Sequence, residues 1–403
     1  MKKTIMLVQV PVHKGFVNRL KDSEFIRGLK KTAFIQRFRG VYHSIRFYKN
    51  YKKFDYGTEF QDYVCKLPFE YAEITNNGEI SACCYLPKNF GNAYKSSFRK
   101  AWNSYFAKQV RKSMLNGSFK YCDKTRCRSM QYYNANLVKK TEVEDERLKN
   151  IIRNSEINMN SDVKTLSLGM DYTCNLECPS CRTGMRKIGK DEVGFQLAKF
   201  NSIIREIGSQ LEMIHISGDG DPFSSKVYHT ILLKTNWDQY PNLKIGIQTN
   251  GIALHDRTWS GLPRSVKSKI SYIGISIDGA TAHTYEKLRL GGKFEKLISN
   301  IEYLANMPDK KDFSISLNLN MIVQVDNYQE MIPLIELGKR IGVDKIGFTY
   351  MYNWGTFMQT EYEQKAVHLP SHPEHSKLLA ILGNPIFNDP VIDVGNLTYL
   401  RQA

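Results

Sequence analysis

Short apolar runs alternate with longer amphipathic stretches over residues 163–350. The short runs are rich in Ile, Leu, Val and Tyr and end close to Gly, Asn or Asp, a pattern that predicts strands. They cover residues 163–170, 211–217, 243–249, 271–277, 313–323 and 344–350. The longer stretches repeat apolar residues at spacings of three and four, which predicts helices. These helices cover residues 191–208, 225–235, 281–305 and 327–341.

Strands and helices that alternate in this way predict parallel strands joined by right-handed crossovers. Six strands suit an α/β fold of the partial (β/α)6 TIM-like barrel type better than a closed barrel of eight, and ligand-binding loops then lie at the carboxyl ends of the strands. We expect five segments along the chain. They are a basic leader (1–55), a small N-terminal cysteine-rich domain (56–135), a helical linker (136–161), the barrel (162–355) and a C-terminal tail (356–403).

Three cysteines follow the first predicted barrel strand, Cys174, Cys178 and Cys181, with the spacing C-x3-C-x2-C. Three thiolates on one short loop can hold three irons of a [4Fe–4S] cluster and leave the fourth iron without a protein ligand. Zinc is the alternative, because close-set cysteines in an intracellular protein often bind it. A structural zinc site needs four ligands, however, and the next histidine, His215, lies in another predicted strand.

The cysteine spacing resembles the signature of the radical S-adenosylmethionine (SAM) enzymes, in which the open iron chelates the methionine end of SAM. In that family a Gly-Gly-Glu-Pro-like motif after the second strand binds the amino group of SAM. The run Ser217-Gly218-Asp219-Gly220-Asp221-Pro222 resembles a variant of this motif, with Asp where Glu is usual. Glycines allow the backbone to approach a ligand closely, and carboxylates accept hydrogen bonds from an ammonium group.

The same resemblance implies further SAM contacts at the ends of later strands. Thr249 and Asn250 would line the site, Ser276 and Asp278 would face the ribose or carboxylate of SAM, and Asn320 would contact SAM from the fifth strand. The stretch from Thr281 to Phe294 resembles the corresponding segment of radical SAM enzymes with SPASM or twitch domains. Ser180 departs from the pattern, since most members carry there an aromatic residue that stacks near the adenine.

A second group of cysteines precedes the barrel, at Cys65, Cys83, Cys84, Cys122 and Cys127. From the residues alone this is a dispersed site of four or five thiolates, suited to zinc or to an iron–sulfur cluster. Four of them, Cys65, Cys83, Cys122 and Cys127, are the expected ligands. Cys84 is left over, because side chains of adjacent residues diverge in an extended strand.

The order of landmarks in this segment resembles a SPASM domain, which binds auxiliary [4Fe–4S] clusters in peptide-modifying radical SAM enzymes. Its position departs from the family, because SPASM domains normally follow the barrel. The resemblance implies one auxiliary [4Fe–4S] cluster. Cys84 is then a candidate hydrogen-atom donor to a substrate radical, with a buried structural thiol or a substitute ligand as the alternatives.

The net charge of +17 is concentrated at the start of the chain. Residues 1–53 hold fourteen Lys or Arg against two acidic residues and so contribute +12. Their apolar residues recur at helical spacing, which suits peripheral contact with an anionic membrane surface, or a helix packed on the protein with a solvated basic face. No stretch approaches the apolar length of a membrane span or of a signal peptide. We therefore expect a cytoplasmic protein, with contact at the inner membrane surface as the alternative.

The resemblance implies an enzyme that reductively cleaves SAM to a 5′-deoxyadenosyl radical, which abstracts a hydrogen atom from a substrate. The expected substrate is a peptide or protein, which would be oxidised, crosslinked or epimerised. The expected electron donor is an external protein such as a flavodoxin or ferredoxin. A carbohydrate or lipid-linked intermediate at the membrane is a second interpretation, and a nucleic-acid-binding protein with structural clusters is a third. We expect no nucleic-acid partner, because no recognisable nucleic-acid module accompanies the basic charge.

Overall fold

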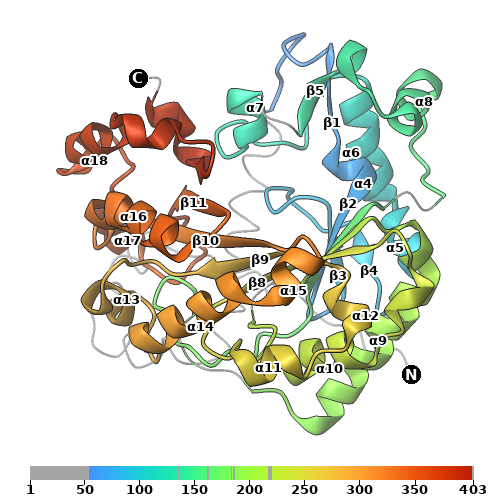
Figure 1. Cartoon of the computed structure of the whole chain (residues 1–403). Coiled ribbons are helices and arrows are strands. Elements are labelled where there is room, and N and C mark those ends of the chain that lie inside the picture. Colours follow the sequence, from blue (N-terminus) through green and yellow to red (C-terminus); the bar gives the residue numbers. More distant parts are fainter. Residues whose placement is uncertain are drawn as a thin grey trace, which may run out of the picture. The chain divides into compact units, whose positions relative to one another are not determined.

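The computed structural model describes residues 54–133, 136–160, 163–182, 184, 187–216 and 220–401. All of these residues belong to one compact unit (Figure 1). Residues 1–53 of the predicted basic leader (1–55) lie outside the described residues. Within the described residues, no helix combines the length and the apolar character needed to cross a membrane.

The six predicted barrel strands are all present and run parallel to their neighbours. They are β6 (Thr165–Gly169), β7 (Met213–Ile216), β8 (Lys244–Thr249), β9 (Ile270–Ser276), β10 (Ser316–Val323) and β11 (Lys345–Tyr350). The sheet that contains them has the order β12-β11-β10-β9-β8-β7-β6-β2-β3-β4 and stays open, with β12 (Ile392–Asp393) and β4 (Gly91–Asn92) at its edges. The predicted partial-barrel α/β fold is confirmed.

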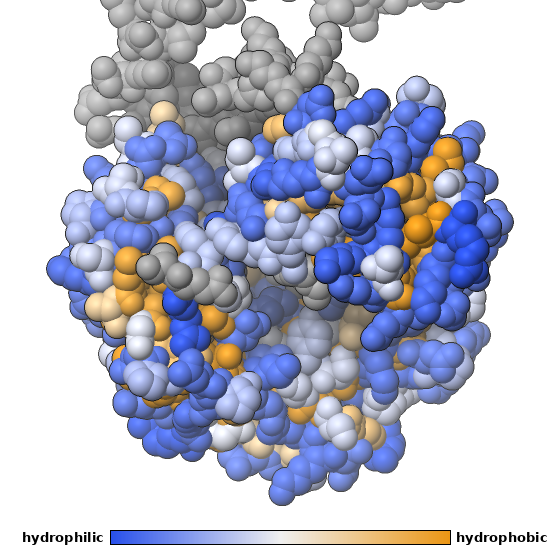
Figure 2. Space-filling model, turned by 90° about the horizontal axis from the view of Figure 1, so that it is seen from above, coloured by the Kyte–Doolittle hydropathy of each residue, from blue (hydrophilic) through white to orange (hydrophobic). Residues whose placement is uncertain are grey.

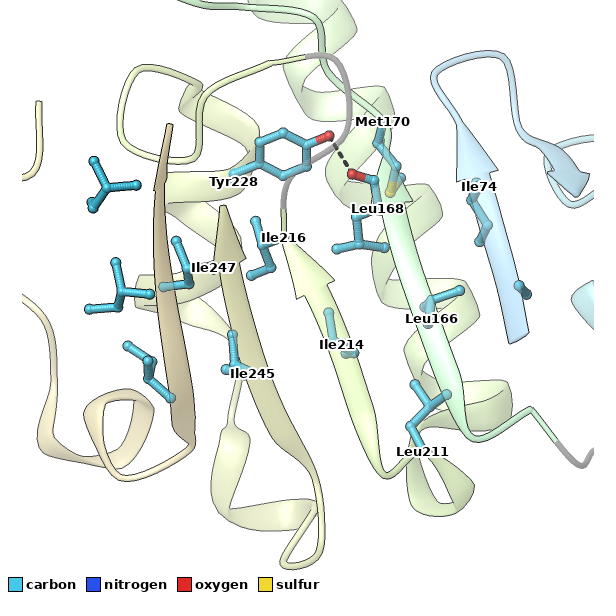
Figure 3. Close-up of a cluster of buried hydrophobic side chains, with 14 of the residues drawn as sticks. Ile74, Leu166, Leu168, Met170, Leu211, Ile214, Ile216, Tyr228, Ile245 and Ile247 are labelled. Atoms are coloured by element: carbon cyan, nitrogen blue, oxygen red, sulfur yellow. Dashed lines mark hydrogen bonds between the residues drawn. The ribbon is translucent and has the colours of Figure 1, made fainter. Parts of the chain in front are cut away.

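The cysteine-rich segment shares this sheet with the barrel. Strand β2 (Tyr71–Thr75) pairs in parallel with β6, and β3 (Glu79–Ser81) and β4 follow as antiparallel neighbours. Figure 3 shows Ile74 of β2 beside Leu166 and Leu168 of β6 in one apolar cluster. The segment that we predicted as a separate N-terminal domain therefore extends the barrel sheet through its first strands.

The predicted helical linker at 136–161 is helical only in part. Its first residues form strand β5 (Leu137–Lys139), which pairs antiparallel with β1 (Tyr63–Cys65), and helix α8 (Glu146–Asn154) follows. Buried Leu137 lies opposite Cys65 in this pairing, so a contact distant in sequence overrides the helical pattern. The prediction of a continuous helix is therefore wrong for the start of this segment.

The predicted barrel helices are present with one change. Residues 281–305 form two helices instead of one, because Gly291 adopts a φ of +90°, which interrupts the helix between Leu288 and Phe294. The helices are α4 (Leu67–Glu70), α5 (Phe98–Trp102), α6 (Tyr105–Leu115), α7 (Arg128–Tyr132), α8, α9 (Lys190–Ile207), α10 (Lys226–Lys234), α11 (Asp256–Ser260), α12 (Arg264–Lys267), α13 (Ala282–Leu288), α14 (Phe294–Asn306), α15 (Pro308–Asp312), α16 (Met331–Ile341), α17 (Gln359–Lys365) and α18 (His375–Leu382).

The apolar core between the sheet and its helices holds the strand ends in place. Alternate residues of β7 and β8, among them Ile214, Ile216 and Ile247, are fully buried on the helix side of the sheet (Figure 3). Burial of each such side chain stabilises the fold by roughly 1.5–3 kcal/mol. Tyr228 of α10 adds a polar anchor, because its hydroxyl donates to the carbonyl of Leu168 at 2.9 Å. This bond fixes the carboxyl end of β6, from which the cysteine loop departs.

The C-terminal tail packs an aromatic cluster against the end of β11. The ring of His368 stacks on Tyr350 with centroids 4.0 Å apart, and the guanidinium of Arg128 lies 4.5 Å from the centre of the Tyr350 ring. Nδ1 of His368 is buried without a hydrogen-bond partner among the described residues. Burial, together with the positive charge of Arg128, lowers the pKa of His368 to about 3.

Protonation of His368 should therefore destabilise the folded protein. Its pKa is lower in the folded state than in the unfolded state, where it is about 6.5, so the free energy of unfolding should fall as the pH drops below 6.5. Between pH 7 and pH 5 the loss from this group is about 2 kcal/mol. In urea titrations at both pH values, His368→Phe should remove this part of the pH dependence, because phenylalanine keeps the stacking. Substitution of the exposed His283 in the same way should leave the dependence unchanged.

Candidate metal and SAM site

The cysteine loop begins with a tight turn built on Asp171. The Asp171 carboxylate is buried and accepts hydrogen bonds from the backbone N of Thr173 at 2.9 Å and from its hydroxyl at 2.7 Å. The loop after β7 packs directly on this turn, since the backbone N of Asp221 donates to the carbonyl of Thr173 at 2.9 Å. Gly220 is required there, because a Cβ atom would come within 2.8 Å of that carbonyl and closer still to the carbonyl of Asp171. The first two strand ends of the barrel are therefore in contact at the site.

Each cysteine of the C-x3-C-x2-C loop has one side-chain N–H donor at its sulfur. Nδ2 of Asn250 lies 3.5 Å from Sγ of Cys174, and an NH1 donor of Arg289 lies 3.8 Å from Sγ of Cys178. NH2 of Arg182 lies 3.5 Å from Sγ of Cys181. The three donors come from the end of β8, from the turn after α13 and from the loop itself. The fold therefore brings together groups that the sequence separates widely.

These donors are suited to thiolates. Burial raises the pKa of Cys174 and of Cys178, while the Arg289 guanidinium acts in the opposite direction on Cys178. A buried neutral thiol is a weak hydrogen-bond partner, whereas a thiolate bound to iron accepts strong charge-assisted bonds from guanidinium groups. The donor set thus fits three cluster-bound thiolates. When such a cluster is bound, Cys174, Cys178 and Cys181 would hold three of its irons.

Asp221, which we predicted to contact the SAM ammonium group, is buried among hydrogen-bond donors of the protein. Its side chain is only 2% exposed. Oδ1 accepts hydrogen bonds from its own loop, and Oδ2 accepts them from the last residue of β8 and the residue after it. The partners of the carboxylate are the backbone N of Phe223, the backbone N and hydroxyl of Ser224, the hydroxyl of Thr249 and the backbone N of Asn250. Asp221 and Thr249 therefore clamp the end of β7 to the end of β8, and this places Asn250 beside Cys174. Ser217, Gly218 and Asp219 lie outside the described residues.

Substitution Asp221→Asn should lower both stability and iron incorporation. The carboxamide would point a donor at groups that already donate, and a lost hydrogen bond to a buried charged acceptor costs about 1.5–3 kcal/mol. We expect the free energy of unfolding in urea to fall by roughly 2–3 kcal/mol. Iron bound per chain after reconstitution should also fall, because Asn250 loses its support. Asp191→Asn, an exposed change of the same kind on α9, should alter neither quantity; an equal effect of both changes would contradict the clamp.

The predicted contacts Ser276 and Asn320 lie on the inner face of the sheet and are joined by a residue that we did not predict. Gln248 donates to the hydroxyl of Ser276 at 2.8 Å and accepts from Nδ2 of Asn320 at 3.4 Å. Gly274, on the strand between them, leaves room for this network, since a Cβ there would clash with the Gln248 amide. The alternation along β8 places Gln248 on the inner face, and this signal was available in the sequence.

Asp278, which we predicted to face the ribose or carboxylate of SAM, also contacts groups of the protein. Its side chain is 2% exposed, and its Oδ2 lies 2.9 Å from Nε of Arg289. Its Oδ1 accepts a hydrogen bond from the backbone N of Ile322 at 2.7 Å. The carboxylate therefore faces the interior and positions Arg289. Sequence reasoning named the segment that contains Arg289 without giving this residue a role, because its contact with Cys178 spans 111 positions.

The five cysteines before the barrel converge from separate segments. Cys65 ends β1, Cys83 and Cys84 follow β3, and Cys122 and Cys127 flank the turn before α7. Burial raises the pKa of Cys65 and of Cys122, and the pKa of Cys122 is raised further by its neighbours Cys65 and Cys127. A hydrogen bond from the Cys83 thiol lowers the pKa of Cys84 and raises that of Cys83.

This arrangement fits an auxiliary cluster held by buried thiolates. A hydrogen bond from Tyr56 to the carbonyl of Cys122, at 2.9 Å, fixes one of the two cysteines of the turn. Among the described residues, no three Cys, His, Asp or Glu side chains approach closely enough to hold a single metal ion. Cys84 is the most exposed thiol of this group, and the carboxylate of Glu73 on β2 and the guanidinium of Arg126 act on it electrostatically.

Comparisons with known proteins agree with this site. Residues 65–129 match the SPASM family, an iron-sulfur cluster-binding domain. The chain is also similar to an AdoMet-dependent heme synthase from Methanosarcina barkeri (strain Fusaro / DSM 804), with 29% identity over 171 residues. That match covers 42% of this chain and 45% of the relative, so the chain spans less than half the length of this curated protein.

Two solved structures overlap with parts of the chain. One is Streptococcus suis SuiB bound to S-adenosylmethionine, at 13% identity and a TM-score of 0.39, covering 62% of this chain and 53% of that one. The other is anSMEcpe with bound AdoMet, at 19% identity and a TM-score of 0.34, covering 47% and 50%. Such partial overlaps do not by themselves define a family.

Together with the cysteine loop and the open parallel barrel, these matches show that the chain is similar to radical SAM enzymes, and that its residues 65–129 match the SPASM domain. Both implied cofactors, a SAM-binding [4Fe–4S] cluster and an auxiliary cluster, fit the thiols described above.

Proposed function

We propose that this protein binds SAM at a [4Fe–4S] cluster on Cys174, Cys178 and Cys181 and uses it to modify a peptide or protein. When bound, the cluster and SAM supply a 5′-deoxyadenosyl radical, which takes a hydrogen atom from an unactivated C–H bond of the substrate. The observation that carries the proposal is the presence of one N–H donor at each of the three sulfurs. The chain's own residues hold and orient the reactants and exclude water.

Several barrel residues have positions that suit SAM binding. Gln248, Ser276 and Asn320 present amide and hydroxyl groups on the inner face of the sheet, near the carboxyl ends of β8, β9 and β10. Such groups can bind the ribose hydroxyls or the carboxylate of SAM. Ser217, Gly218 and Asp219 stay our candidates for the amino group, by the resemblance of their motif. Asn250 supports Cys174 and completes this edge of the site.

The SPASM domain supports a peptide or protein as the substrate class, since its relatives mostly modify peptides. Cys65, Cys83, Cys122 and Cys127 would hold the auxiliary cluster, which could accept the electron left after hydrogen abstraction and make the reaction a two-electron oxidation. Cys84 offers the other outcome. Its exposed thiol could return a hydrogen atom to the substrate radical, and the thiyl radical left on Cys84 would then take an electron from the external donor and a proton, so that the substrate is neither oxidised nor reduced overall. An external flavodoxin- or ferredoxin-like protein would supply the electron.

The experiment that tests this function is an anaerobic assay of the full-length protein. The protein is reconstituted with iron and sulfide, reduced, and given SAM together with a library of peptides carrying deuterium on carbon. We expect 5′-deoxyadenosine by mass spectrometry, and deuterium in it when a peptide is the substrate. Formation of 5′-deoxyadenosine without deuterium from any peptide would contradict the substrate class. No 5′-deoxyadenosine from a protein with full iron content would contradict the proposed function.

The face of the molecule shown in Figure 2 is mostly hydrophilic, with a hollow near its centre. Among the described residues, the large apolar side chains that stay exposed include Trp354, at 62% exposure, just after β11. Thr356, two residues further on, donates to the carbonyl of Ser180 in the cysteine loop at 3.2 Å. The segment after β11 therefore borders the cysteine loop. We propose that the exposed side chain of Trp354 contributes to binding of the peptide substrate.

A further inference from the structure

The turn that carries Arg289 is bound directly to the cysteine loop. The backbone N of Glu177 donates to the carbonyl of Leu290 at 3.0 Å, one residue before Cys178. The backbone N of Arg289 itself donates to the carbonyl of Tyr285 at 2.7 Å, which continues the end of α13 into this turn. The backbone around Arg289 is therefore fixed on one side by the cysteine loop and on the other by α13. This places its guanidinium next to Cys178.

The guanidinium of Arg289 contacts both a carboxylate and a sulfur. Its Nε lies 2.9 Å from Oδ2 of Asp278, and its NH1 lies 3.8 Å from Sγ of Cys178. The side chain of Arg289 is 13% exposed and that of Asp278 is 2% exposed, so water screens the pair weakly. The positive charge of Arg289 is therefore balanced by a carboxylate that is almost fully buried.

A charge at this position acts on the redox equilibrium of the cluster. One-electron reduction adds a negative charge to the cluster, so a nearby positive charge favours the reduced form and a nearby negative charge opposes it. Charges and hydrogen bonds at the sulfurs are among the main determinants of iron–sulfur potentials. The two members of the pair should therefore act in opposite directions, Arg289 raising the potential and Asp278 lowering it.

We infer that the Asp278–Arg289 pair sets the reduction potential of the cluster on Cys174, Cys178 and Cys181. This inference rests on the proposed function, since it requires that the cluster is bound. Both residues are positioning residues, because they act through Cys178. The pair leaves the region next to the sulfur close to neutral, and the loss of either member leaves a single uncompensated charge there.

The test is a potentiometric titration of the full-length reconstituted protein, followed by electron paramagnetic resonance. The signal of this cluster is recognised by its change when SAM is added, which separates it from the auxiliary cluster. Arg289→Gln should lower the ratio of reduced to oxidised cluster at a fixed potential at least tenfold, which equals 59 mV for one electron. Asp278→Asn should raise the ratio by a similar factor. The double variant should return close to the wild type.

A second variant and a matched control complete the test. Asn at position 278 keeps an oxygen for the backbone N of Ile322, so Asp278→Asn carries the prediction alone if Arg289→Gln does not fold. Lys287→Gln is the matched control, because it removes a positive charge from α13, where Lys287 pairs with Asp326 at 2.8 Å. That charge is exposed, so its removal should shift the ratio by much less than tenfold.

The outcomes separate this inference from the proposed function. Shifts of the same sign in both single variants, no shift in either, or an equal shift in Lys287→Gln would each overturn the inference. Absence of any SAM-responsive cluster in the wild type would overturn the proposed function as well. If a SAM-responsive cluster is present and its potential is unchanged in Arg289→Gln and in Asp278→Asn, only the inference is overturned, and the proposed function stands.

Discussion

Replacement of Cys174, Cys178 and Cys181 together by alanine should reduce the yield of 5′-deoxyadenosine to that of an enzyme-free control. No thiolate would then remain to hold the irons at the end of β6, and the reaction has no other route to an electron at SAM. Iron bound after reconstitution should fall by about four atoms per chain, because one cluster is lost and the other stays. Mass spectrometry of the nucleoside and a colorimetric iron assay check the two results.

The matched control for this variant is Ser260→Ala, an exposed change on α11 that removes a side-chain group of similar size. It should keep both the iron content and the yield of the wild type. Continued SAM cleavage by the triple variant would show that the open iron is held elsewhere. Loss of all iron, instead of about four atoms, would show that the two cysteine groups are not independent.

The second large effect concerns Arg111, a buried arginine of the SPASM domain with 0% exposure. Its Nε donates to the carbonyl of Pro68 at 2.9 Å, and NH2 donates to that of Trp102 at 2.9 Å. NH1 reaches the carbonyl of Ile157 and the side chain of Asn103, both at 3.2 Å. The guanidinium also lies 4.6 Å from the centre of the Trp102 ring. One side chain thus joins α4, α5, α6 and the segment after α8.

Arg111→Met should lower the free energy of unfolding by about 4 kcal/mol, since it leaves the buried carbonyl groups of Pro68 and Trp102 without this donor at about 1–3 kcal/mol each, removes a partly buried bond to Ile157 and removes the contact with the Trp102 ring. Urea titration followed by circular dichroism measures the change. Lys112→Met, at the neighbouring exposed position of α6, changes the charge in the same way and should cost much less. A similar loss in both variants would contradict a specific role of the guanidinium.

The barrel was predictable because its signals are local. Each of the six strands, β6 to β11, is a short apolar run with a Gly, Asn or Asp close to its end, and the structure places every one within a few residues of its predicted range. Strand β5 was missed because it has only three residues, too few for the alternation of apolar and polar positions that indicates a strand. Its pairing with β1 depends on a contact 72 positions away, between Cys65 and Leu137.

The sequence predicted a set of residues for the site. It did not predict which partners their side chains have in the fold. The sequence alone does not show whether the carboxylates of Asp221 and Asp278 are exposed to a ligand or buried among hydrogen-bond donors of the protein, because the residue type is the same in both cases. Their roles follow from contacts across the sheet, such as that of Asp221 with Asn250. Asn250 stays a predicted SAM contact, and its contact with the Cys174 sulfur could be found only from the fold.

The parallel pairing of β2 with β6 joins the segments that carry the two groups of cysteines. Cys65 ends β1, before β2, and Cys83 follows β3, after it, while β2 itself is hydrogen-bonded to β6, the strand that leads to Cys174. A hinge between two separate modules would let their spacing vary through a catalytic cycle. Here five consecutive residue pairs, from Tyr71–Thr165 to Thr75–Gly169, bind the two strands along their length. In the function that we propose, an electron passing between the clusters would cross between segments that this sheet joins.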